Sequence, residues 1–188
     1  MAMSLDSSAE TIRLAKSHNG VFAAVGIHPW NAVVPAEEVR QQLSQLVRQK
    51  GVVALGEIGL DYARTPQTKE NQNELLIYEL SLAQETGLLV NIHCRDAHQD
   101  MMTILRKEMG PNLKGIIHGF HGDQMMLKDW LALGFYVSIG VRGFVTDEQL
   151  HLVAAVRKLL SALYAILKRG VAYDPNWEEN SRLAVARH

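Results

Sequence analysis

The chain has 188 residues, which is enough for one domain with a sizeable core and short for two. Hydrophobic residues make up 47% and charged residues 21% of it. A formal net charge of −1 gives no sign of a strongly basic nucleic-acid-binding surface, although a nucleic-acid enzyme can take its positive charge from bound metal ions. The single cysteine, Cys94, excludes an internal disulfide, and without a signal peptide or a membrane-spanning apolar run we expect a cytoplasmic or, in a eukaryote, nuclear protein.

Short apolar runs alternate with amphipathic segments along most of the chain. Runs bounded by turn residues predict strands, and apolar residues spaced three or four apart predict helices. The predicted strands cover residues 21–27, 52–57, 88–93, 113–118 and 135–139. The predicted helices cover residues 9–17, 35–50, 65–86, 97–109, 126–133 and 147–169.

This alternation predicts the fold class. Strands that alternate with helices form parallel βα units with right-handed crossovers, in either an open doubly wound sheet or a β/α barrel. No GxGxxG turn is present to favour the open sheet. We therefore expect an α/β fold with five clear parallel strands, and the residues alone leave the open sheet and the barrel as alternatives.

Three of the predicted strands end in side chains that bind divalent metals. Glu57, His93 and His118 each follow an apolar run, and the C-terminal ends of parallel strands converge on one face. Two imidazoles and a carboxylate suit zinc or manganese, and such an ion polarises a phosphoryl oxygen and activates a bound water. The alternative for each residue is a packed, hydrogen-bonded side chain without a catalytic role.

Neighbouring residues are candidates for supporting roles. Arg95 is a candidate phosphate clamp, and Asp96 is a candidate acceptor that orients an imidazole. His28 is either a pocket residue or a turn residue, and His121 is a weaker candidate on a loop. Cys94 lies on the opposite strand face from the neighbouring histidine, which favours packing over nucleophilic chemistry.

Four segments carry a family resemblance, and they occur in order along the chain: Gly-Ile-His-Pro at 26–29, Gly-Glu-Ile-Gly-Leu-Asp at 56–61, His-Cys-Arg-Asp-Ala-His at 93–98 and His-Gly-Phe-His-Gly at 118–122. Together they resemble the successive motifs of the TatD family of metal-dependent deoxyribonucleases, over about residues 4–145. The resemblance implies a single TIM-barrel-like α/β metallohydrolase domain over residues 1–188, with a divergent helical region at 146–188. Because a complete barrel takes about 250 residues, we expect an incomplete barrel with five clear parallel strands. It also implies cleavage of phosphodiester bonds in DNA, often at single-stranded ends, with Mg, Mn or Zn.

The resemblance also implies roles for individual residues. Glu57 resembles the carboxylate that bridges two metals, and His93 and His118 resemble the ligands of the second metal. On this basis Glu57 and Arg95 are expected to act in catalysis. The residues expected to contact the substrate are His28, Asp61, Asp96 and His121.

Both ends of the chain depart from the family pattern. The family's HxH metal motif has no counterpart in residues 1–20. The helix predicted over 147–169 continues through 159–169, where the family has the strand that leads to its Glu-Thr-Asp-x-Pro motif. Asp174 is the nearest substitute for the aspartate of that motif. We therefore expect one metal site instead of two.

These departures leave alternative functions open. One is a catalytically impaired remnant that binds a metal or a partner, and another is a related hydrolase acting on amides or lactones, because a metal site alone does not choose the bond. The unpaired sheet edges of an incomplete barrel also predict self-association. No membrane partner is expected.

Overall fold

The computed structural model describes residues 1–110 and 113–139. Their elements follow in the order α1 (Leu5–Ser17), β1 (Ala23–Val25), η1 (Pro29–Asn31), α2 (Glu37–Val47), β2 (Val52–Asp61), η2 (Pro66–Thr68), α3 (Lys69–Thr86), β3 (Leu89–Arg95), α4 (His98–Glu108), β4 (Gly115–Phe120), α5 (Gln124–Ala132) and β5 (Tyr136–Ile139), where η marks a short 3₁₀ helix. The helix predicted from residue 147, the terminal helical region and the substitute aspartate Asp174 lie outside the described residues.

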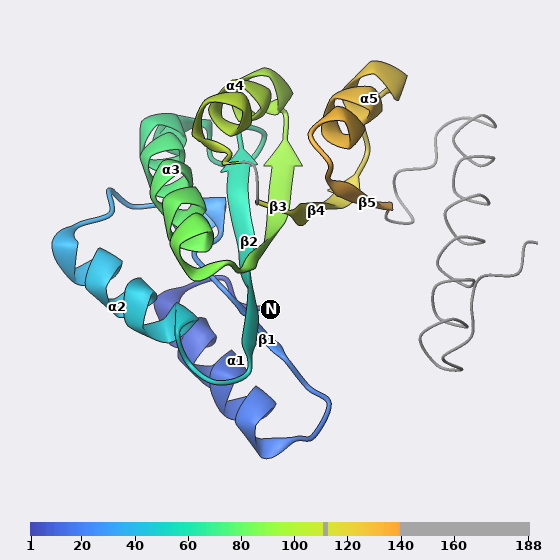
Figure 1. The fold of residues 1–188 in the computed structure, drawn as a ribbon. Coiled ribbons are helices and arrows are strands. Elements are labelled where there is room, and N and C mark those ends of the chain that lie inside the picture. The colour runs from blue at the N-terminus through green and yellow to red at the C-terminus, as the bar shows by residue number, and fades with distance from the viewer. Residues whose placement is uncertain (111–112, 140–188) are drawn as a thin grey trace, which may run out of the picture. The chain divides into compact units, whose positions relative to one another are not determined.

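The strands of the described residues form one parallel sheet in the order β1-β2-β3-β4-β5. Each strand therefore pairs with the next one along the chain, as expected for successive βα units. Helix α1 packs on β1, α3 on β2, α4 on β3 and α5 on β5 (Figure 1). The predicted α/β class with five parallel strands is confirmed, and β1 and β5 are the edges of this sheet.

Several predicted boundaries are wrong, for local reasons. Helix α1 begins at Leu5 instead of residue 9 because Ser4 and Ser7 form a capping box, in which each side chain accepts from the other's backbone N–H. The strand predicted at 21–27 is reduced to Ala23–Val25. Helix α3 begins at Lys69 instead of residue 65, because Thr65 and Pro66, the first residues of the predicted helix, begin the 3₁₀ turn η2.

The strand ends also differ from the prediction. The three candidate metal-binding residues do not end their strands: β2 continues from Glu57 to Asp61, β3 from His93 to Arg95 and β4 to Phe120. Strand β2 continues because its backbone still pairs with β3 as far as Asp61, which lies opposite Arg95. The side chains nevertheless lie in the C-terminal halves of their strands.

The core lies between the helices and the sheet, and the apolar positions that predicted the helices are buried there. They include Leu43 and Val47 of α2, Leu76 and Leu80 of α3, and Met101 and Leu105 of α4. Helix α3 is unusual because it also buries two polar side chains, Gln72 and Glu79, completely. Among the described residues, no helix is long and apolar enough to cross a membrane.

Candidate active site

Glu57 lies at an irregularity in the pairing of β2 with β3. Gly56 pairs with Asn91 and Ile58 with Ile92, so that Glu57 is an extra residue in β2. Such a bulge turns the strand locally and re-aims the side chain of the extra residue. Gly56 allows the two strands to approach here, because a Cβ on it would lie 2.6 Å from the Asn91 Cβ.

Gly59, the second glycine beside Glu57, brings β2 close to His93. Its φ is +138°, a conformation that favours glycine, and a Cβ would lie 2.0 Å from the His93 carbonyl oxygen. The two glycines of the Gly-Glu-Ile-Gly motif are therefore steric requirements of the site. They place the Glu57 carboxylate beside the imidazole of the neighbouring strand.

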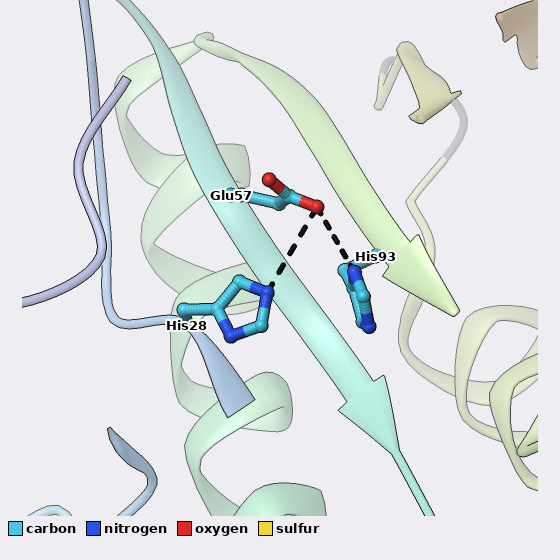
Figure 2. Close-up of side chains that lie close together, drawn as sticks. All are labelled: His28, Glu57 and His93. Atoms are coloured by element: carbon cyan, nitrogen blue, oxygen red, sulfur yellow. Dashed lines mark hydrogen bonds and ion pairs between the residues drawn. The ribbon is translucent and has the colours of Figure 1, made fainter. Parts of the chain in front are cut away.

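Three side chains of types that can hold a metal ion meet at this point, and we call His28, Glu57 and His93 the metal-binding cluster. Glu57 Oε1 lies 3.0 Å from His93 Nδ1 and 3.9 Å from His28 Nε2. One ligand atom from each residue lies within 4.8 Å of the other two. Figure 2 shows the carboxylate facing both rings, which come from β3 and from the segment just before η1. The structure thus brings together Glu57 and His93, as predicted, and adds His28.

The charge of the cluster is set by these contacts. Burial alone would raise the pKa of Glu57, but the hydrogen bond with His93 and the electrostatic attraction of His93 and His118 hold it below its ordinary value. The carboxyl group is therefore ionised and available to a cation at neutral pH.

His118, the third predicted metal-binding residue, lies apart from this group. Its side chain on β4 is exposed, and it makes no hydrogen bond to the cluster. It is still near, because its charge contributes to lowering the Glu57 pKa and because the preceding residue, Ile117, pairs with Ile92 next to His93. His118 therefore borders the cluster on the β4 side.

Asp61 orients His93, although the sequence assigned this kind of role to Asp96. The Asp61 side chain is fully buried, and its Oδ2 lies 3.0 Å from His93 Nε2 and accepts from Trp30 Nε1 at 2.7 Å. Its Oδ1 accepts from the Arg64 backbone N–H at 2.8 Å. Burial raises the pKa of Asp61, but the hydrogen bonds, that of Trp30 first, hold it below its ordinary value.

The donor set fits a divalent cation. His93 lies between two carboxylates, with Nδ1 facing Glu57 and Nε2 facing Asp61, so a neutral ring that donates its Nε2–H to Asp61 would present the lone pair of Nδ1 to a cation beside Glu57. A histidine that binds a metal usually donates its other ring N–H to a carboxylate in this manner. A cation between His93 Nδ1 and Glu57 Oε1 would satisfy both atoms.

His28 presents a different atom to the cluster. Its Nδ1 accepts a hydrogen bond from the Trp30 backbone N–H at 3.2 Å, so the ring proton lies on Nε2, the nitrogen that faces Glu57. Burial, followed by the charge of His93, lowers the pKa of His28 to about 4, so its ring is neutral at pH 7. His28 therefore offers an N–H donor, which suits a substrate oxygen better than a metal.

The remaining predicted residues lie at the ends of β3 and β4. Arg95 and Asp96 are exposed, and Asp96 has a φ of 52°. Asp96 and His121 line a cavity of about 570 Å³ without hydrogen-bonding to the metal-binding cluster. Cys94 lines the same cavity, and burial raises the pKa of its thiol to about 12, which agrees with the predicted packing role.

The sequence did not indicate four residues that support the cluster. Trp30 and Arg64 border it, and Gln72 and Glu79 of α3 lie behind it. Gln72 Oε1 accepts from the Asp61 backbone N–H at 2.8 Å, and Glu79 Oε1 accepts from the Ile27 N–H, also at 2.8 Å. The sequence feature that could have identified Gln72 and Glu79 is their position, seven residues apart, on the apolar face of the predicted helix.

Comparisons with known proteins agree with this architecture. A family model described as TatD related DNase matches residues 1–163. The chain is 35% identical, over 162 residues, to a 3'-5' ssDNA/RNA exonuclease TatD from Enterobacter lignolyticus, covering 86% of this chain and 61% of that protein. It is 38% identical, over 139 residues, to the uncharacterized metal-dependent hydrolase YcfH from Escherichia coli K12, covering 73% of this chain and 52% of that protein.

Solved structures show the same fold. The crystal structure of YJJV, a TatD homolog from Escherichia coli K12, matches with a TM-score of 0.66 and 32% identity over 72% of this chain and 53% of that one. A TatD family hydrolase from Entamoeba histolytica matches with a TM-score of 0.65 and 24% identity, over 73% of this chain and 49% of that one. The chain thus spans between 49% and 61% of the length of these four proteins.

Proposed function

Because the chain belongs to the TatD family of metal-dependent DNases, we propose that it hydrolyses phosphodiester bonds in DNA, with single-stranded ends as the preferred substrate. The observation that carries this proposal is the contact series Glu57–His93–Asp61, in which one carboxylate faces the ligand nitrogen and another fixes the ring. The name of the Enterobacter relative, an ssDNA/RNA exonuclease, supports a single-stranded substrate.

We assign Glu57, His93 and His118 as the metal-binding residues, with Mg, Mn or Zn as the ion and one site instead of two. When bound, the ion polarises a phosphoryl oxygen and lowers the pKa of a coordinated water. Glu57 and His93 already face one another, and His118 would join them from β4. Asp61 keeps the His93 proton on Nε2, so that Nδ1 stays available as a ligand.

The other polar groups contact the substrate in this proposal. The His28 Nε2–H donates to a phosphoryl oxygen, and burial keeps the ring neutral so that this donor does not depend on pH near 7. Arg95, exposed at the end of β3, contacts a phosphate. Asp96 and His121 contact a part of the substrate that enters the cavity they line. The preserved Glu57–His93–Asp61 contacts favour hydrolysis over an impaired remnant.

The test compares hydrolysis by the native chain with that by Glu57→Gln and His93→Ala. A 5'-labelled single-stranded oligonucleotide is incubated with Mg²⁺, Mn²⁺ or Zn²⁺, and the products are resolved by length. We expect each variant to reduce the rate at least about a hundredfold, because each removes a metal-binding group. Glu85→Gln is the matched control, since Glu85 is an exposed carboxylate that pairs with Arg48 away from the cluster. Equal hydrolysis by all four proteins would contradict the proposal.

A further inference from the structure

Trp30 and Arg64 form a stacked pair beside the metal-binding cluster. The Arg64 guanidinium carbon lies 3.9 Å from the centre of the Trp30 ring. The Trp30 ring lies 4.6 Å from the His28 ring and 6.3 Å from the His93 ring, measured between centroids. The pair therefore lies directly beside the residues that we assign to catalysis.

Both members of the pair are fixed by the carboxylate that orients His93. Asp61 accepts from Trp30 Nε1 at 2.7 Å and from the Arg64 backbone N–H at 2.8 Å. The indole and the start of the Arg64 side chain are thereby held in a defined position relative to the metal-binding cluster. A preorganised donor loses less conformational entropy when a ligand binds.

The Arg64 side chain carries a positive charge that the protein does not neutralise. Among residues 1–110 and 113–139, no carboxylate lies within ion-pair distance of its guanidinium. The side chain is exposed, and its charge contributes to lowering the His28 pKa, so the field of the guanidinium reaches the site. Stacking uses the face of the guanidinium and leaves its N–H edge available to a phosphate.

We propose that Arg64, held in place by Trp30, binds a phosphate of the nucleic-acid strand next to the phosphate that is cleaved. This subsite rests on the proposed function and specifies it further: the substrate class is an oligonucleotide with at least two phosphodiester groups. A diester with one phosphate reaches the metal-binding cluster without contacting Arg64. The outer face of the guanidinium can also stack on a base, as arginine planes do in single-strand recognition.

The experiment compares Arg64→Ala with the native chain on two substrates, a single-stranded oligonucleotide and bis(p-nitrophenyl) phosphate, which contains one phosphate. We expect KM for the oligonucleotide to rise about 10- to 100-fold, the loss typical of a hydrogen bond to a charged group, while kcat/KM for the small diester stays within about twofold. Arg64→Lys should restore only part of the affinity, because lysine retains the charge but not the planar stack. Equal losses on both substrates, or no loss on the oligonucleotide, would overturn the proposal.

Arg40→Ala is the matched control. Arg40 also stacks on an aromatic ring, with its guanidinium carbon 4.7 Å from the Tyr78 ring centre, and it belongs to α2 instead of the site. Its loss should leave both kinetic constants unchanged. A similar KM increase in Arg40→Ala would show a general charge effect and contradict a specific Arg64 subsite.

A binding measurement separates failure of this proposal from failure of the proposed function. Fluorescence anisotropy of a labelled single-stranded oligonucleotide is followed at several salt concentrations without turnover. The native chain could bind DNA and hydrolyse neither substrate. In that case the phosphate contact is still supported if the plot of log association constant against log salt concentration is shallower by about 0.7 in Arg64→Ala than in the native chain. An unchanged slope rejects the Arg64 subsite alone, and absence of both binding and hydrolysis rejects the subsite together with the proposed function.

Discussion

At the scale of single residues, Asp61 connects the parts of the site. Its carboxylate contacts His93, Trp30 and the backbone of Arg64, so one buried side chain orients the proposed metal-binding imidazole and the proposed phosphate subsite. The sequence motif identified Asp61 as a site residue but not as the acceptor that fixes the ring. That role depends on the facing strand, which lies 32 residues further along the chain.

We expect Asp61→Asn to weaken metal binding about 10- to 100-fold, because an amide no longer accepts the His93 proton as a carboxylate does. Titration with Mn²⁺ or Zn²⁺ by calorimetry measures this loss. Asp129→Asn is the control, since Asp129 makes a comparable contact with His98 Nε2 at 3.0 Å on α4 and α5. Equal metal affinity in Asp61→Asn and the native chain would show that Asp61 does not support a metal ligand.

Glu79 is a second single residue whose contacts predict a measurable effect, here on the stability of the fold. Its side chain is fully buried, Oε1 accepts from the Ile27 N–H, and Oε2 has no hydrogen-bond partner. Burial raises the pKa of Glu79 well above its ordinary value of 4.5, although the Ile27 hydrogen bond acts in the opposite direction. The folded state therefore holds a proton that the unfolded state releases above pH 4.5, so Glu79 reduces stability as the pH rises from there through its raised pKa.

Glu79→Gln removes this ionisation while keeping the shape of the side chain. We expect the native chain to lose stability relative to the variant as the pH rises from 5 to 8, because burial raises the pKa of Glu79 and an amide has no proton to lose. Urea unfolding at pH 5, 6.5 and 8 tests this. A variant that loses stability relative to the native chain over this pH range would show that the ionised carboxylate contributes to folding.

At the scale of elements, the site depends on close contact between β2 and β3 and on helix α3 behind them. Gly56 and Gly59 let the two strands approach where Glu57 and His93 meet. From the other side, Gln72 and Glu79 lie two helical turns apart on α3 and bond to the backbones of Asp61 and Ile27. One helix therefore holds the segments that carry Asp61 and His28.

We expect Gly59→Ala to destabilise the protein by at least about 2 kcal/mol, because the new Cβ would meet the His93 carbonyl oxygen and the φ is unfavourable for alanine. Gly87→Ala is the matched control, since its φ is also positive, at 67°, but open space surrounds the position. That variant should cost about 1 kcal/mol. Thermal unfolding of the two variants measures both losses of stability. Equal losses in Gly59→Ala and Gly87→Ala would mean that β2 and β3 do not approach closely at Gly59.

At the scale of the whole molecule, the described sheet has two edges, β1 and β5. Phe22, beside β1, is 65% exposed, and Tyr136 of β5 is 68% exposed. Edge strands with exposed apolar neighbours favour pairing with another chain, and the self-association predicted from the sequence stays a prediction. Light scattering after size-exclusion chromatography should show a mass that increases with concentration, and less so in Phe22→Lys. A constant monomer mass in the native chain would contradict it.

The sequence by itself determined the fold class and two of the three clustered residues. Apolar runs alternating with amphipathic segments are local patterns, and they predicted parallel βα units with Glu57 and His93 toward the C-terminal ends of their strands. The tertiary structure decided the rest. It placed His28 beside Glu57, left His118 exposed, gave Asp61 the orienting role and stacked Arg64 on Trp30. These contacts join segments far apart in the sequence, and they depend on a register shift and on close strand approach that no local pattern encodes.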